Sequence, residues 1–130
     1  MNSRSKNARV LRVTVGETLD QAGARATATV KAIEAGRPLK PFFGASFSQI
    51  GAMLAVFTPK RWELIAALRQ AGPATAAELA RRLQRHYKNV HADVNILIDW
   101  MAIERGADGR VSVPWSEIVV DMKLPEQLAA

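Results

Sequence analysis

A short run of polar side chains has the residue types and spacing to read the edges of DNA bases. The run consists of Lys88, Asn89, His91 and Asn95. Lysine can donate to guanine and asparagine can pair with adenine, at about 1–3 kcal/mol of discrimination for a good pair. A phosphate backbone would repel carboxylates, and in the stretch that starts at Lys88 the first carboxylates are Asp93 and Asp99. We therefore take the four polar residues as the candidate base-reading side chains.

The element that must carry these side chains is an amphipathic helix from about residue 87 to residue 101. Its apolar residues recur at i, i+4, i+7, i+8 and i+11, which is one face of a 3.6-residue period: Val90, Val94, Leu97, Ile98 and Met101. The helix before it starts with a capping box made by Thr75 and Glu78, and its inner face is formed by Leu79, Ala80 and Leu83. Two consecutive helices joined by a tight turn predict a helix-turn-helix.

Two further helices are predicted ahead of this pair. Residues 47–57 have apolar positions at helical spacing, and Ser46 or Ser48 could be the N-cap. The dipeptide Thr58-Pro59 is a strong helix start, because a capping hydroxyl precedes the proline favoured at the first helical position. The buried face of this helix continues to about Ala71 through Trp62, Ile65 and Leu68.

A β-hairpin is predicted after the helix-turn-helix. Residues 103–105 are extended, residues 106–109 read GADG and end in the Asp-Gly of a hairpin turn, and residues 110–113 return as an alternating strand. Residues 115–124 are predicted to form a third segment, extended or mixed. Three helices followed by a hairpin match the winged-helix arrangement, with the hairpin as the wing.

The N-terminal part is predicted to be an arm, a strand and a helix. Residues 1–8 are polar and basic, residues 9–15 are rich in β-branched residues, and residues 17–35 have helical spacing with Gly36 just beyond the end. One face of this helix is a narrow stripe of mostly small residues: Leu19, Ala22, Ala26, Val30 and Ile33. The stripe is either packed on the helix's own domain or paired with a partner subunit. Residues 37–44 form a connecting segment whose Phe42 and Phe43 pack against a neighbouring surface.

Composition narrows the class of protein. The chain has 130 residues, 48% of them hydrophobic, which suffices for one packed core. Its 18 Lys and Arg against 12 Asp and Glu give a formal net charge of +6, which favours a polyanionic partner such as nucleic acid or an acidic protein surface. There is no cysteine, and no apolar run approaches a membrane span. We expect a soluble protein of a prokaryotic cytoplasm, associated with the nucleoid when bound to DNA.

The predicted fold class is mainly α with a small β wing (α+β), a winged helix-turn-helix with an N-terminal strand-helix extension. The predicted domains are residues 1–44 for dimerisation or partner binding, residues 45–124 for DNA binding, and residues 125–130 as a tail.

A family resemblance supports this interpretation over about residues 46–124. The stretches that carry it are FTPKRW (57–62), GPATAAELARRL (72–83), HYKNVHADV (86–94) and IERGADGRVSVPWSEIVVDMKL (103–124). They resemble small prokaryotic winged-helix DNA-binding proteins, related in architecture to the regulators of the multiple-antibiotic-resistance (MarR) type. The resemblance implies a transcriptional regulator, and some members are antitoxins encoded beside a small toxin. The chain departs from it in the turn, where a glycine is expected near Gln84 and an acidic cap at the place of His86.

The remaining candidate contacts follow from how a recognition helix enters the major groove. Phosphates of the DNA backbone would be held by Lys60, Arg61, Thr75, Arg81, Arg82, Arg85 and Tyr87. In the wing, Arg105 or Arg110 would reach the backbone or the minor groove. Basic residues on exposed helices are often only solvated, so about half of this set is expected to touch DNA.

Enzymatic activity has no support in the sequence. There is no glycine-rich phosphate loop, no serine-histidine pairing of the hydrolase kind and no carboxylate pair with a reason to converge. His86 and His91 diverge by about 140° on a helix and cannot both bind one metal there. No cofactor is expected. Asp93 and Asp99 are expected to pair with neighbouring Arg or Lys, and the three tryptophans to be core or interface residues.

Three functions remain open. The leading hypothesis is a sequence-specific repressor of transcription that binds double-stranded DNA as a homodimer, because two-fold symmetry doubles a short half-site. The alternative is an antitoxin of a type II toxin-antitoxin pair, which regulates its own operon and neutralises a protein toxin through the N-terminal helix and residues 37–44, either alone or together with the C-terminal strand. The third is a winged helix used only for protein contacts.

Overall fold

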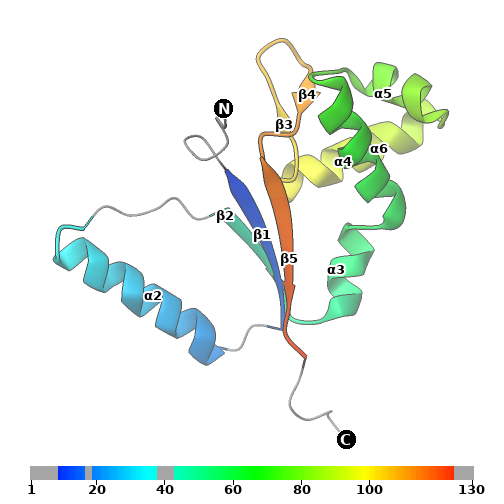
Figure 1. The fold of residues 1–130 in the computed structure, drawn as a ribbon. Helices are drawn as coiled ribbons and strands as arrows, with labels where there is room; N and C mark the ends of the chain where they lie inside the picture. The colour runs from blue at the N-terminus through cyan, green and yellow to red at the C-terminus, as the bar shows by residue number, and fades with distance from the viewer. Residues whose placement is uncertain (1–8, 17–18, 38–42, 125–130) are drawn as a thin grey trace, which may run out of the picture.

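A three-stranded parallel sheet pairs a strand from the N-terminal part of the chain with a strand from its C-terminal part. The computed structural model describes residues 9–16, 19–37 and 43–124, which form an α/β fold (Figure 1). In chain order the elements are β1 (Val10–Val15), α2 (Leu19–Glu34), β2 (Phe43–Phe47), α3 (Ile50–Val56), α4 (Pro59–Ala71), α5 (Ala76–Leu83), α6 (Tyr87–Asp99), β3 (Glu104–Arg105), β4 (Val111–Ser112) and β5 (Glu117–Met122). The sheet order is β2-β1-β5, and β3 pairs with β4 in a separate antiparallel hairpin.

The central strand β1 supplies the sheet's part of the core. It pairs with β5 from Val10↔Glu117 to Val15↔Met122, and with β2 along its other edge. Alternation places Leu11, Val13 and Val15 on one face of the strand, where all three are buried. This face packs on the helices, so β1 anchors both edge strands to the main core.

Aromatic side chains connect the sheet to the helices. Phe47 of β2 stacks on Trp100 after α6, with ring centroids 4.6 Å apart, and meets Phe57 edge to face at 6.3 Å. Phe57 in turn stacks on Trp62 of α4 at 5.0 Å. The buried Trp115 donates its indole N–H to the Met101 carbonyl at 2.8 Å. The expectation that the tryptophans are core or interface residues is confirmed.

Aromatic and cationic contacts fix the residues immediately before β5. Phe43 meets Trp115 edge to face at 5.0 Å, and the Arg9 guanidinium lies over both rings at 5.0 and 4.9 Å. From α4, Arg69 donates to the carbonyls of Trp115 and Ser116. These contacts hold β5 beside β1. The expected packing of Phe43 is therefore present, whereas Phe42 lies outside the described residues.

Helix α2 stands apart from the other four helices of the described residues. Figure 1 shows it on one side of the sheet and α3 to α6 on the other. Nearly all of its described side chains are exposed, including Val30 (53%) and Ile33 (59%). The helix ends as expected at a left-handed glycine, Gly36, with φ +70°.

Most local predictions are confirmed, with three corrections. The short helix is capped by Gln49, and neither Ser46 nor Ser48 is its N-cap, because Ser46 is a residue of β2. The connecting segment ends earlier than expected, since Phe43 and Gly44 also belong to β2. The recognition-helix candidate ends at Asp99, so Met101 is not on its apolar face but follows it with φ +67° and 45% exposure.

The predicted domain boundary between residues 44 and 45 falls inside β2. The predicted strand of residues 9–15 and the extended segment of residues 115–124 contain β1 and β5, which pair with each other. The predicted arm (1–8) and tail (125–130) lie outside the described residues.

Candidate nucleic-acid interface

The start of α5 is fixed by the predicted capping box. The Thr75 hydroxyl accepts from the Glu78 N–H at 3.1 Å, and the Glu78 carboxylate accepts from the Thr75 N–H at 2.8 Å. The backbone hydrogen bond from Thr75 is the largest cause that lowers the pKa of Glu78, and the Arg110 charge adds to it. Thr75 thus caps α5, and the Glu78 carboxylate stays negatively charged and hydrogen-bonded to the Thr75 N–H.

The turn between α5 and α6 is tight and left-handed. Gln84 has φ 54° and ψ 48°, and the Arg85 N–H donates to the Ala80 carbonyl at 3.0 Å. This is the position at which a glycine was expected. His86 then caps α6, because its Nδ1 accepts from the Lys88 N–H at 3.3 Å. An imidazole nitrogen thus takes the role expected of an acidic cap.

Asp93 holds α6 against the two helices that support it. Its carboxylate accepts from Nε of Arg61 in α4 at 2.9 Å and from Nη2 of Arg85 in the turn at 2.7 Å. Arg61 also donates to the carbonyls of Ala55 and Val56. The side chains of the three charged residues are only 13–18% exposed. The expected pairing of Asp93 is confirmed, and the only carboxylate in the first nine residues of α6 is turned inward.

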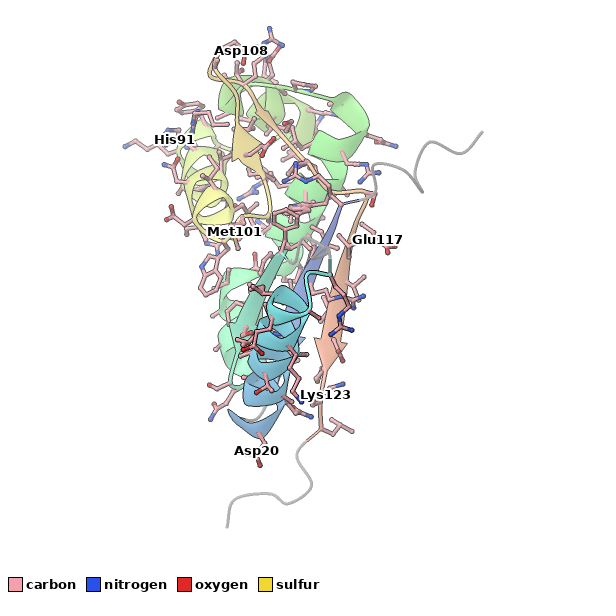
Figure 2. The ribbon with its side chains drawn as sticks, turned by 90° about the vertical axis from the view of Figure 1, so that its left-hand side faces the viewer. Asp20, His91, Met101, Asp108, Glu117 and Lys123 are labelled. Atoms are coloured by element: carbon pink, nitrogen blue, oxygen red, sulfur yellow. The ribbon has the colours of Figure 1, made fainter. Side chains whose placement is uncertain are left out.

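Three of the base-reading candidates lie on the opposite face of α6, the fourth, Asn89, lies on its flank, and all four are exposed. Lys88, His91 and Asn95 lie within about 60° of arc around the helix axis, and Asn89 is offset from Lys88 by about 100°. Tyr87 is 50% exposed and stacks on His91 with ring centroids 5.6 Å apart. Figure 2 shows His91 on the outer side of α6. All four candidates are therefore accessible, but only Lys88, His91 and Asn95 share one face, and Asn89 lies on the opposite flank, about 160° from His91.

The predicted phosphate-binding residues fall into two groups. Lys60, Arg81 and Arg82 are exposed and take part in no ion pair among the described residues. Arg61 and Arg85 are instead bound to Asp93. A shallow, open depression of about 530 Å³ lies between α5 and the start of α6, lined by Ala77, Ala80, Arg81, Gln84, Arg85 and Tyr87. Its lining thus includes the guanidinium-bearing Arg81 of α5 and Arg85 of the turn, together with Tyr87 of α6.

The hairpin of β3 and β4 is joined to α5. Arg105 donates across the hairpin to the Gly109 carbonyl at 3.2 Å, and Arg110 reaches the Pro73 carbonyl at 3.5 Å and the Glu78 carboxylate at 3.7 Å. The backbone of Val111 exchanges two hydrogen bonds with Ala74, at 3.0 and 2.8 Å. These bonds fix the base of the hairpin beside α5, while its tip, marked by Asp108 in Figure 2, projects from the molecule.

Comparison with known protein families gives a match that covers α4, α5, α6 and the hairpin. The family model HVO_A0114 matches residues 56–120, which is half of the chain. The chain belongs to the HVO_A0114 family. The function of this family is unknown. No curated protein matches the chain, and no solved structure matches it.

The HVO_A0114 match coincides with the candidate interface. It runs from Val56, the last residue of α3, to Val120 in β5, so it contains α4, α5, α6 and the hairpin. Strands β1 and β2 and helix α2 lie outside it. No helix of the described residues is both long and apolar enough to cross a bilayer. Within the same residues, no cluster of three or more His, Asp or Glu side chains could hold a metal ion.

The predicted partner-binding stripe on α2 is not brought to this site. Ala22 is half-buried, and Ala26, Val30 and Ile33 are exposed. The backbone of Leu19 begins α2, but its side chain lies outside the described part of the chain. Three of the stripe's five side chains are therefore exposed to solvent rather than packed on the rest of the chain.

The inward position of Asp93 is what the sequence-based reasoning missed. Asp93 is three residues after Val90 and four before Leu97, so the same 3.6-residue period that identified the apolar face places it on that face. A carboxylate at such a position needs cationic partners, and Arg85, two residues before the start of α6, was a near candidate. The pattern could thus have assigned Arg85 to an internal ion pair.

Proposed function

We propose that this protein is a sequence-specific regulator of transcription that binds double-stranded DNA, in which α4, α5, α6 and the hairpin act as a winged helix-turn-helix. The observation that carries the proposal is the charge distribution on α6. Its one early carboxylate is turned inward between two arginines, and its exposed sides present Lys88, His91 and two asparagines. The first nine residues of α6 therefore expose no carboxylate that would repel a phosphate, and the exposed Asp99 lies at the C-terminal end, away from the turns that would approach the bases.

In this proposal α6 enters the major groove with its N-terminal turns nearest the bases. Lys88 would donate to guanine, and Asn89 or Asn95 would pair with adenine. Arg81 and Arg82 of α5, with Lys60 of α4, would contact phosphates. The Asp93 ion pairs keep α6 at a fixed angle to the supporting helices, so Arg61 and Arg85 act as positioning residues rather than as direct DNA contacts.

The hairpin would lie along the flanking DNA. Arg105 and Arg110 are its cations, and both are exposed although each makes a hydrogen bond to a backbone carbonyl. Their role would be to contact the backbone or the minor groove beside the base-reading helix. A repressor that acts as a homodimer would read two such half-sites, each with one copy of α6.

The test compares binding of the protein to a fragment of its own promoter and to an unrelated duplex of equal length, across a series of salt concentrations. Phosphate contacts alone bind every duplex and weaken steeply with salt. The proposal expects tighter binding to the promoter, with a preference of about tenfold or more that persists as salt rises. Equal and weak binding to both duplexes would contradict it.

A second function, neutralisation of a protein toxin, is supported by α2. This helix projects from the sheet and exposes Val30 and Ile33, two apolar side chains one helical turn apart. An antitoxin would present such a surface to its toxin. Co-purification of the product of the adjacent gene would support this function if it is lost in Val30→Asp with Ile33→Asp and retained in Lys88→Ala. Absence of co-purification with the unaltered protein would refute it.

A further inference from the structure

Strand β5 is an open edge of the parallel sheet. The sheet order places β1 on one side of it, and no other strand of the described residues pairs with its outer side. Its six residues, EIVVDM, are regular, contain no proline and have an apolar centre. Val120 is 41% exposed and Met122 44%. Natural proteins protect such edges with charge, proline, bulges or a covering element, because an uncovered apolar edge pairs with other chains.

The hydrogen-bonding groups at this edge can be assigned from the pairing with β1. The Lys123 N–H donates to the Val15 carbonyl at 2.8 Å, so Lys123 directs its amide toward β1. Backbone groups of successive residues point to opposite sides of a strand. Met122, Val120 and Ile118 therefore direct their N–H and C=O groups toward the open edge.

We propose that β5 pairs antiparallel with β5 of a second copy of this chain, about a two-fold axis at Val120. This register sets Val120 opposite itself and Ile118 opposite Met122 of the second copy. It also places Glu117 of each copy opposite Lys123 of the other copy. The two-fold axis therefore gives two attractive charge pairs, one at each end of the paired strands. Figure 2 shows Glu117 and Lys123 at opposite ends of β5.

Charge excludes the neighbouring registers. A two-fold axis at Val119 would place Glu117 of each copy opposite Asp121 of the other copy. An axis at Asp121 would place the two Asp121 carboxylates opposite each other. Like charges directly opposite each other destabilise a strand pair. The register centred on Val120 joins Glu117 with Lys123, pairs Val120 with itself and Ile118 with Met122, and sets Asp121 opposite Val119, so that no like charges face each other.

The other edge of the sheet is less suited to this pairing. Strand β2 has five residues, with Gly44 and Ala45 in its interior, and only two residues separate its end from the start of α3. Glycine weakens a strand because it packs no side chain. The resulting dimer would have one continuous six-stranded sheet, with two-fold symmetry and the same surface used by both copies.

A single introduced cysteine tests this interface, because the chain has none of its own. Opposed residues of a hydrogen-bonded antiparallel pair have Cα atoms about 5.5 Å apart, which is within the range that a disulfide spans. We expect full-length Val120→Cys to form a covalent dimer on mild oxidation. The matched control is Ile33→Cys, an exposed apolar position on α2, which should remain largely uncrosslinked. Efficient crosslinking of Ile33→Cys and none of Val120→Cys would overturn the proposal in favour of an α2 interface.

The charge register is tested by sedimentation of unmodified variants. Glu117→Lys replaces two attractive pairs with two repulsive ones and should weaken dimerisation by about tenfold or more. Adding Lys123→Glu in the same chain restores opposite charges and should restore dimerisation. If the double variant is as weak as the single one, or if the wild-type protein sediments as a monomer at every concentration, the proposal is wrong. These assays contain no DNA, so their outcome is independent of the proposed DNA binding.

Discussion

Removal of the Asp93 carboxylate should destabilise the protein by about 3 kcal/mol. It accepts charge-assisted hydrogen bonds from Arg61 and Arg85 at 2.9 and 2.7 Å. Hydrogen bonds to charged groups contribute about 1.5–3 kcal/mol each, and breaking a fully buried ion pair by removing one partner costs about 3–5 kcal/mol. The three side chains are still 13–18% exposed, so solvent screening reduces the effect below the upper limit.

The assay is urea unfolding of Asp93→Ala, followed by circular dichroism. The matched control is Asp99→Ala, which removes an exposed carboxylate from the same helix and should change the free energy of unfolding by no more than about 0.5 kcal/mol. Because Asp93 and Arg85 interact, the double variant Asp93→Ala with Arg85→Ala should lose less than the sum of the single losses. Equal unfolding midpoints for Asp93→Ala and Asp99→Ala would refute the argument that this ion pair fixes α6.

Three further predictions concern the backbone and pH. Gly16→Ala should destabilise by about 2 kcal/mol, measured by urea unfolding, because φ is +83° and the added Cβ would lie 2.7 Å from the Lys123 carbonyl oxygen; an unchanged midpoint would contradict this. Gln84→Gly should stabilise by about 0.5–1 kcal/mol in the same assay, since φ of 54° suits glycine, and a loss of stability would be evidence against it. The pKa of Glu78 is lowered by the hydrogen bond from Thr75, so its stabilisation is present above the ordinary value of 4.5 and is lost as pH falls through the lower folded value. The stability advantage of wild type over Glu78→Gln should therefore shrink below pH 4.5, and an advantage independent of pH would refute this assignment.

The parts of the fold that depend only on residues close together in the sequence could be predicted. The cap at Thr58 is followed by proline, and the capping box at Thr75 and the hairpin turn ending at Gly109 have equally local signals. Each such signal occupies only a few residues, so its geometry is encoded where it acts. The same holds for the exposed polar face of α6, which follows from the helical period of its apolar residues.

The sheet could not be predicted in the same way. β1 and β5 are separated by about a hundred residues, and a short β-branched strand does not specify its partner. Serine is favoured at helix N-caps, so the sequence predicts Ser46 as a candidate cap, but pairing with Thr14 of β1 places it in a strand. Tertiary pairing overrode a local preference at that position.

Within the candidate site, residue type alone could not separate the cations that face solvent from those that face inward. Arg81 and Arg82 are exposed, whereas Arg85 is bound to Asp93. The difference depends on where α5 ends and how the left-handed Gln84 redirects the chain. The position of a guanidinium group is therefore set by the turn, which sequence patterns predicted only in outline.

The most direct test of the account is promoter binding by the double variant Lys88→Ala with Asn89→Ala. Both side chains are exposed on α6, so the variant should keep the stability of the wild-type protein. The matched control for the lost charge is Lys31→Ala on α2, which should bind as the wild type does. The account predicts that the double variant loses the preference for the promoter over an unrelated duplex while weak, salt-sensitive binding to both remains. An unchanged preference in the double variant would contradict the assignment of α6 as the base-reading helix.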